Sequence, residues 1–161
     1  YGGAIRPVRP ADLPALRAVI EATALFPADL LDGMLAGHLS GEADEEIWLT
    51  DDADGPVAVA YCAPERMTQG TWNLYLIAVH PARQSEGRGA ALIWEVERLV
   101  VARGAHQMLV ETSGLPEFQR IRDFYPRCGF AAEALIRDFY RRGEDKVVFR
   151  KVLALADPAS R

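Results

Sequence analysis

The residues best suited to bind an anionic ligand lie between positions 80 and 90, in the sequence His-Pro-Ala-Arg-Gln-Ser-Glu-Gly-Arg-Gly-Ala. Gly87 and Gly89 are separated by one residue, and glycine lets the backbone approach a ligand without an intervening Cβ. Residues 74–79 before this stretch form a nearly continuous apolar run, typical of a buried strand. Apolar residues after it recur at helical spacing from residue 92 to residue 100. We therefore predict a loop that joins a strand to a helix.

The first turn of such a helix can bind a phosphate group. Its N–H groups have no acceptor within the helix, and the aligned peptide dipoles add partial positive charge there. The same glycine spacing also occurs in tight turns that bind no ligand, so the glycines alone leave both interpretations open. The Walker loop is excluded because no Gly-Lys-Ser/Thr occurs here, and the dinucleotide fingerprint needs a third Gly where Leu92 stands.

A second motif lies further along the chain. The loop reads Gln-x-x-Gly-x-Gly, from Gln84 to Gly89, directly after a strand, and residues 124–130 read Phe-Tyr-Pro-Arg-Cys-Gly-Phe. In these two places the chain resembles the GNAT superfamily of acyl-CoA-dependent N-acetyltransferases, whose second motif is aromatic-Tyr-x-x-x-Gly-Phe. Several further segments resemble a bacterial GNAT subgroup of unassigned substrate: residues 23–27, 63–66, 71–74, 111–114 and 137–140.

The length of 161 residues suits one hydrophobic core, so we expect a single domain over residues 1–161. The resemblance implies an α/β GNAT fold with a mixed central sheet of about six to seven strands flanked by helices. The apolar patterns predict strands at residues 4–9, 47–50, 56–62, 71–79, 108–112, 130–136 and 146–153. They predict helices at residues 13–23, with Asp12 as N-cap, at 28–38, from the loop to residue 103, and at 117–125. Turns are expected at residues 51–55 and 138–145, and a frayed tail at 154–161.

Composition narrows the class of protein. The net charge of −5, from 18 basic and 23 acidic residues, argues against a nucleic-acid binder. Acidic residues gather at positions 42–54, and we interpret them as solvated loop charges, with attraction of a cationic amine as the alternative.

We expect a cytoplasmic protein, because no apolar run approaches the roughly 18 residues of a membrane span and the first three residues are no signal peptide. Cys62 and Cys128 fit no metal-ligand spacing and are expected to be reduced thiols.

The resemblance also implies roles for individual residues, with acetyl-CoA as the cosubstrate. Backbone groups of the strand would bind the pantetheine arm and the thioester oxygen, and the loop would bind the pyrophosphate through its N–H groups. Tyr125 would protonate the departing thiolate, whereas Phe118 stands where many members have Asn and would pack on the cofactor instead. The expected cofactor-binding residues are Ile77, Ala78, Val79, Gln84, Ser85, Glu86, Gly87, Arg88, Gly89, Ala90, Phe118 and Tyr125.

The general base and the acceptor are less defined by the sequence. Glu111 is the best carboxylate candidate for a catalytic base, followed by Asp138 and Tyr75. A structural role for Glu111 is an equal alternative, and solvent acting through a water chain is another candidate for the base. His80 is expected to have a capping or surface role. The expected partner is an amine on a small molecule or protein, and the apolar hairpin at residues 139–140 suits a homodimer. A non-catalytic CoA-binding sensor is the alternative, suggested by the missing Asn and by a proline after Tyr125.

Overall fold

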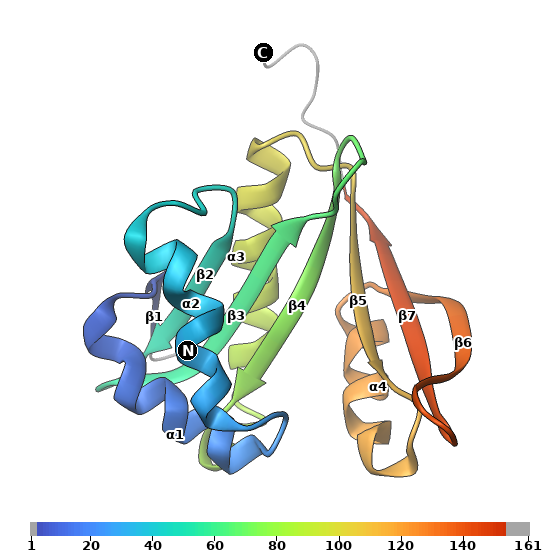
Figure 1. Ribbon diagram of the computed structural model, residues 1–161, viewed down its shortest axis with the longest axis horizontal. Coiled ribbons are helices and arrows are strands. Elements are labelled where there is room, and N and C mark those ends of the chain that lie inside the picture. Colours follow the sequence, from blue (N-terminus) through green and yellow to red (C-terminus); the bar gives the residue numbers. More distant parts are fainter. Residues whose placement is uncertain (1–2, 154–161) are drawn as a thin grey trace. The chain divides into compact units, whose positions relative to one another are not determined.

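Seven strands form a mixed sheet in the order β1-β2-β3-β4-β5-β7-β6 in the computed structural model, which describes residues 3–153 (Figure 1). The strands are β1 (Ala4–Pro7), β2 (Ile47–Asp52), β3 (Pro56–Pro64), β4 (Thr71–Val79), β5 (Gln107–Ser113), β6 (Ala131–Arg141) and β7 (Glu144–Val152). The helices are α1 (Leu13–Thr23), α2 (Leu31–Ser40), α3 (Arg88–Ala102) and α4 (Gln119–Arg127). Short 3-10 turns precede them: η1 (Pro10–Asp12), η2 (Ala28–Leu30), η3 (Pro81–Arg83) and η4 (Pro116–Phe118). The predicted order of strands and helices is confirmed.

Strand β4 and helix α3 are each divided between two compact units. The first unit contains the residues up to Ala63 together with Tyr75–Arg98, and the second contains Pro64–Leu74 and the residues from Leu99 onward. The single domain expected from the length stays a prediction. No helix within residues 3–153 has both the length and the apolar character needed to cross a membrane.

Helices α1 and α2 cover one face of the strands in the first unit. Apolar residues in α1 recur at intervals of three and four, so they line one side of the helix and pack on the strands. The part of α3 in this unit lies on the other face, behind the strands in Figure 1, with Leu92, Ile93 and Val96 fully buried. The core between α1, α2 and the strands contains Val8, Leu16, Val19, Ile20, Leu31, Leu35, Trp48, Val59, Leu76 and Ala78.

The second unit contains the parallel part of the sheet. Residues Thr71–Leu74 of β4 pair in parallel with residues 107–110 of β5, and β5 pairs antiparallel with β7 along its whole length. Helix α4 packs on this sheet through Tyr125, whose ring centroid lies 5.4 Å from that of Phe149 on β7.

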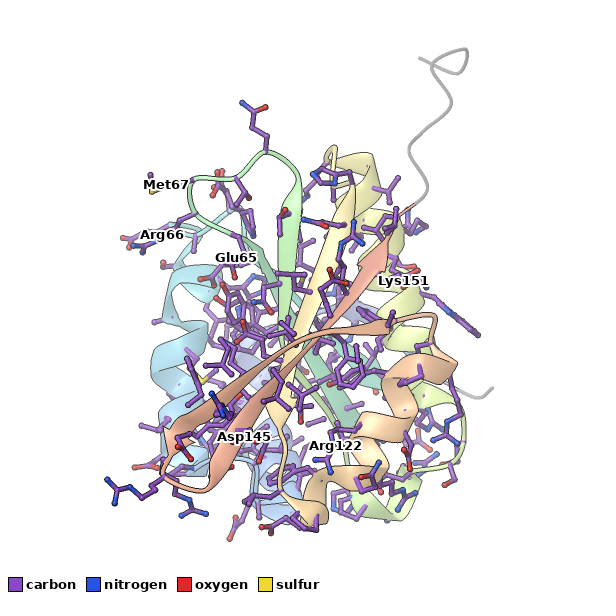
Figure 2. The ribbon with its side chains drawn as sticks, turned by 90° about the vertical axis from the view of Figure 1, so that its right-hand side faces the viewer. Glu65, Arg66, Met67, Arg122, Asp145 and Lys151 are labelled. Atoms are coloured by element: carbon purple, nitrogen blue, oxygen red, sulfur yellow. The ribbon has the colours of Figure 1, made fainter. Side chains whose placement is uncertain are left out.

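Charged side chains attach α4 at both of its ends. Arg122, labelled on α4 in Figure 2, donates hydrogen bonds to the backbone carbonyls of Ser113 and Leu115 at 2.7 and 2.8 Å. Lys151, labelled on β7 in the same view, donates to the carbonyl of Cys128 just after the helix at 2.8 Å. These bonds fix the helix that carries Tyr125.

Several predicted boundaries are wrong. The turn predicted at 51–55 begins later, because Asp51 and Asp52 continue β2. The loop predicted at 138–145 is shorter, because β6 continues to Arg141 and β7 begins at Glu144. The pairing is irregular between Ile136 and Arg141, where an Asp145 carboxylate oxygen accepts the N–H of Asp138 at 3.0 Å. Asp12 precedes α1 but does not cap it, since its carboxylate instead accepts hydrogen bonds from Arg6 at 2.8 Å. The tail predicted at 154–161 lies outside the described residues.

Candidate active site

The end of β4 is fixed by hydrogen bonds on both sides of His80. The N–H of His80 donates to the carbonyl of Val57 at 2.9 Å, and its Nδ1 accepts the N–H of Ala82 at 3.1 Å, which caps η3. The predicted capping role of His80 is confirmed. Ile77, Ala78 and Val79, whose backbone was predicted to bind the cofactor, form the strand residues just before this cap.

The loop after η3 turns through two left-handed residues. Ser85 has φ of 65° and Gly87 has φ of 82°. Gln84 braces the loop against the strand, because its Nε2 donates to the carbonyl of Val79 at 3.2 Å. A Cβ added at Gly87 would have no atom within 4 Å, so this glycine serves the backbone conformation and not a crowded contact. Left-handed residues in such a loop turn neighbouring N–H groups toward one side, a geometry that binds anions.

Helix α3 starts directly after the loop and contributes its first turn to the site. Its first hydrogen bond runs from the N–H of Ala91 to the carbonyl of Gly87 at 3.1 Å. The N–H groups of Gly89 and Ala90 therefore precede the regular helical bonds, at the positive end of a helix of 15 residues. The structure thus brings the predicted strand residues and the predicted loop residues together in one unit, directly before the first turn of α3.

The Arg88 guanidinium is engaged in a buried ion pair and is not available to bind a phosphate. It donates to a carboxylate oxygen of Asp51 at 3.0 Å, and the two side chains are 4% and 0% exposed. Arg88 can therefore offer a bound phosphate only its backbone N–H. The interpretation of Asp51 as a solvated loop charge is wrong, because β2 carries it into the interior against the start of α3.

Glu86 places a carboxylate beside the loop, which would repel a phosphate if it were uncompensated. Its Oε1 accepts a hydrogen bond from Arg83 Nε at 2.7 Å and lies 3.5 Å from Arg88 Nε. The hydrogen bond from Arg83, followed by the charges of both arginines, lowers the pKa of Glu86. The loop therefore presents a carboxylate that is paired with the Arg83 guanidinium.

Tyr125 lies in the second unit, near the end of α4, and is 4% exposed. Burial raises the pKa of its phenol above the usual tyrosine value. The chain returns after the helix, where Gly129 has φ of 92° and the N–H of Phe130 donates to the carbonyl of Tyr125 at 3.1 Å. The ring of Phe130 then packs edge-on to that of Tyr125, with 5.8 Å between centroids. The Gly-Phe pair of the motif therefore ends the helix and holds the tyrosine ring.

Pro126 and Phe118 are the two departures from the family motif near Tyr125. The helix predicted to end at residue 125 continues through Pro126 to Arg127, so Tyr125 keeps a helical position. The proline supplies no N–H to the helix, and α4 ends one residue later at Arg127. Phe118 is half-buried and takes the N-cap position of α4, without a side-chain cap.

Glu111 belongs to a polar cluster in the second unit. Its Oε1 lies 3.1 Å from Lys146 Nζ and accepts a hydrogen bond from Asn73 Nδ2 at 3.4 Å. The same Nδ2 donates to Glu65 Oε1 at 2.8 Å. Asn73 is 1% exposed, and its Oδ1 has no hydrogen-bond partner among the described residues. The sequence prediction missed Asn73, although a polar residue within an otherwise apolar strand was a signal.

The other two candidate bases have structural contacts. Asp138 accepts the N–H of Gly143 at 2.7 Å and so stabilises the β6–β7 turn. Tyr75 stacks on Tyr61 with 5.4 Å between ring centroids, and Tyr61 stacks on Trp48 in turn. Cys62 and Cys128 are both free and buried, and burial raises the pKa of the Cys62 thiol to about 12.

Comparison with known proteins identifies the class. The family described as Acetyltransferase (GNAT) domain matches residues 43–132. The crystal structure of a GNAT-family protein from Desulfovibrio desulfuricans is similar to 94% of this chain and 99% of that one, with 37% sequence identity and a TM-score of 0.88. The chain therefore belongs to the GNAT acetyltransferase family, whose members are acyl-CoA-dependent N-acetyltransferases.

More distant structures share the fold. The Escherichia coli ribosomal-protein-S18-alanine N-acetyltransferase has 19% identity and a TM-score of 0.76, with 97% of each chain covered. YncA from Salmonella typhimurium, solved with its cofactor acetyl-CoA, has 18% identity and a TM-score of 0.76, with 98% of this chain and 99% of that one covered. No curated protein matches the chain.

Proposed function

We propose that this chain transfers the acetyl group of acetyl-CoA to a primary amine of a small molecule or protein, by direct attack of the neutral amine on the thioester. The observation that carries the proposal is the loop at residues 84–90, where left-handed Ser85 and Gly87 lead into the first turn of α3. Its N–H groups would bind the pyrophosphate, and the backbone of Ile77, Ala78 and Val79 would bind the pantetheine arm. Membership in the family and the acetyl-CoA bound to YncA support this assignment.

Tyr125 would act as the general acid. Burial raises its pKa, so the phenol keeps its proton throughout the neutral range and can donate it to the departing sulfur. The amine nitrogen forms a bond to the thioester carbon, the carbon–sulfur bond breaks, and the thiolate takes the phenol proton. The nitrogen releases its surplus proton, and the phenolate is reprotonated through solvent.

A direct experiment separates binding from turnover. We expect acetyl-CoA at millimolar concentration to raise the melting temperature by several degrees, because a ligand that binds only the folded state stabilises it. We expect release of the CoA thiol, read with a thiol reagent, only when a suitable amine from a broad panel is added. The absence of any thermal shift with acetyl-CoA and with CoA would refute the proposal, whereas binding without turnover on every amine would favour the CoA-binding sensor.

Glu111 would receive the proton that the ammonium form of the amine must lose before attack. Its Oε1 is held by Lys146 and Asn73, so the carboxylate has a defined position. Replacing Glu111 with glutamine keeps the side-chain shape but removes the base, and we expect kcat/KM for the amine to fall about a hundredfold or more. The measurement is steady-state kinetics between pH 6 and 9. Glu133→Gln, at an exposed position of β6, is the matched control. A purely structural role for Glu111 would instead lower the melting temperature and leave kcat/KM near that of the control.

A further inference from the structure

Trp94 on α3 is the exposed member of the chain's three tryptophans. Trp48 and Trp72 are 1% and 6% exposed, whereas Trp94 is 60% exposed. Among residues 3–153 its indole has no hydrogen bond and no ring contact. Tryptophan is highly buried in most proteins, because its ring offers a large apolar surface. An indole that the fold leaves in water can stack on a flat ligand, and its position decides which ligand reaches it.

Trp94 lies one turn after the residues that begin α3. It is four positions after Ala90, so the two residues share one side of the helix and are about 6 Å apart along its axis. A long side chain in a helix leans toward the N-terminus and covers the turn before its own Cα. That turn contains Ala90 and Ala91, whose methyl groups leave room beside the indole. The loop at residues 84–90 and Trp94 belong to the same compact unit.

This side of α3 faces away from the core. Ile93 and Val96 are fully buried, whereas Trp94 and Arg98, which are four residues apart on one side of the helix, are exposed. A ligand that begins at the N-terminus of the helix can therefore extend along this side without displacing a core side chain.

The cosubstrate contains a group of the required shape. Acetyl-CoA is the cosubstrate of the family, and YncA was solved with it. Its pyrophosphate joins the pantetheine arm to an adenosine, so a pyrophosphate held by the N–H groups of Gly89 and Ala90 would place the start of the adenosine at the first turn of α3. One ribose separates the base from the diphosphate, a span comparable to the helical pitch of about 5.4 Å. Adenine is flat and aromatic, and aromatic side chains stack on such bases.

We propose that Trp94 stacks on the adenine ring of acetyl-CoA and adds an adenine subsite to the loop that binds the pyrophosphate. This inference rests on the proposed function, because the adenine reaches Trp94 only if the loop at residues 84–90 holds the pyrophosphate. The stack lies at the opposite end of the cosubstrate from the thioester, so Trp94 binds the donor and takes no part in the chemistry. It favours a free acyl-CoA over a donor whose phosphopantetheine arm is attached to a carrier protein, because that arm has no adenine.

Calorimetric titration tests the subsite with CoA and with 4′-phosphopantetheine, which keeps the arm and one phosphate but lacks the adenosine. Trp94→Leu removes the stack, so we expect its Kd for CoA to rise about fivefold or more and its Kd for 4′-phosphopantetheine to stay within about twofold of the wild type. Trp94→Tyr retains an aromatic ring and should bind CoA within about threefold of the wild type. Arg98→Met changes the same side of α3 one turn later and is the matched control, with an unchanged Kd for CoA.

Tryptophan fluorescence gives a second readout that does not depend on catalysis. An indole in water emits at longer wavelength than a buried one, so Trp94 should dominate the red side of the emission spectrum. We expect CoA to quench this emission and 4′-phosphopantetheine to leave it unchanged. Trp94→Tyr should lose the quenching by CoA, which assigns the signal to Trp94 rather than to Trp48 or Trp72.

The outcomes distinguish this inference from the proposed function. A wild type that binds CoA, together with an unchanged Kd in Trp94→Leu, would overturn the adenine stack while leaving the acetyltransferase intact. An equal loss of affinity for CoA and for 4′-phosphopantetheine in Trp94→Leu would also overturn it, because the variant would then act through the loop. A wild type that binds no CoA would refute the proposed function instead. Because Trp94 is exposed, its replacement should leave the melting temperature of the ligand-free protein within about 2 °C of the wild type.

Discussion

Replacing Tyr125 with phenylalanine should lower kcat by about 10²–10⁴-fold while acetyl-CoA binding stays within about threefold of the wild type. The substitution removes only the hydroxyl. The ring keeps its contacts with Phe130 and Phe149, whose centroids lie 5.8 and 5.4 Å away, so the end of α4 should remain folded. Steady-state kinetics and calorimetric titration of CoA measure the two effects separately. A loss of less than threefold in kcat would contradict the role of general acid.

The pH dependence of kcat tests the role of Tyr125 in a second way. Burial raises the pKa of Tyr125 above its usual value near 10, so the phenol should stay protonated at any pH at which the fold is stable. We expect kcat of the wild type to show no alkaline decline from this group below about pH 10. An acid decline should remain, because the amine must lose a proton before it attacks. The Tyr125→Phe variant should keep that acid decline at a much lower rate, which separates loss of the acid from loss of the base.

The sequence predicted those parts of the site that depend on local pattern. The change from an apolar run to helical spacing located β4, the loop and α3, and Thr71–Val79 was predicted to the residue. The aromatic-Tyr-x-x-x-Gly-Phe motif also has a local cause, since the left-handed Gly129 returns Phe130 onto Tyr125. Such features depend on neighbours within a few residues, and their composition is sufficient to predict them.

The missed features depend on pairing between distant segments. Asp51 and Arg88 are 37 residues apart in the chain, and their charges meet only because β2 packs against the start of α3. Asn73 and Glu111 are 38 residues apart and meet because β4 and β5 pair in parallel. Ser85 has a left-handed φ that is uncommon for serine, so no residue preference pointed to it. The charge count suggested solvated acidic loops because counting ignores these partners.

Replacing Arg88 with methionine should lower the free energy of unfolding by about 3–5 kcal/mol, because it leaves the fully buried Asp51 without its ion-pair partner. The corresponding fall in melting temperature is about 6–20 °C for a protein of this size. Urea unfolding and calorimetry measure the two values. Arg98→Met is the matched control on the same helix, because Arg98 pairs with Glu95 at the surface and such a pair contributes less than about 1 kcal/mol.

A double variant shows whether the buried charge is the cause. Asp51→Asn combined with Arg88→Met removes both charges of the buried ion pair, so it should be more stable than Arg88→Met alone. Because Arg88 begins α3, the single variant should also loosen the first turn that offers Gly89 and Ala90 N–H groups to the pyrophosphate. Acetyl-CoA should then raise the melting temperature of Arg88→Met less than that of Arg98→Met. Equal acetyl-CoA-dependent rises in melting temperature for Arg88→Met and Arg98→Met would show that the buried pair does not support the loop.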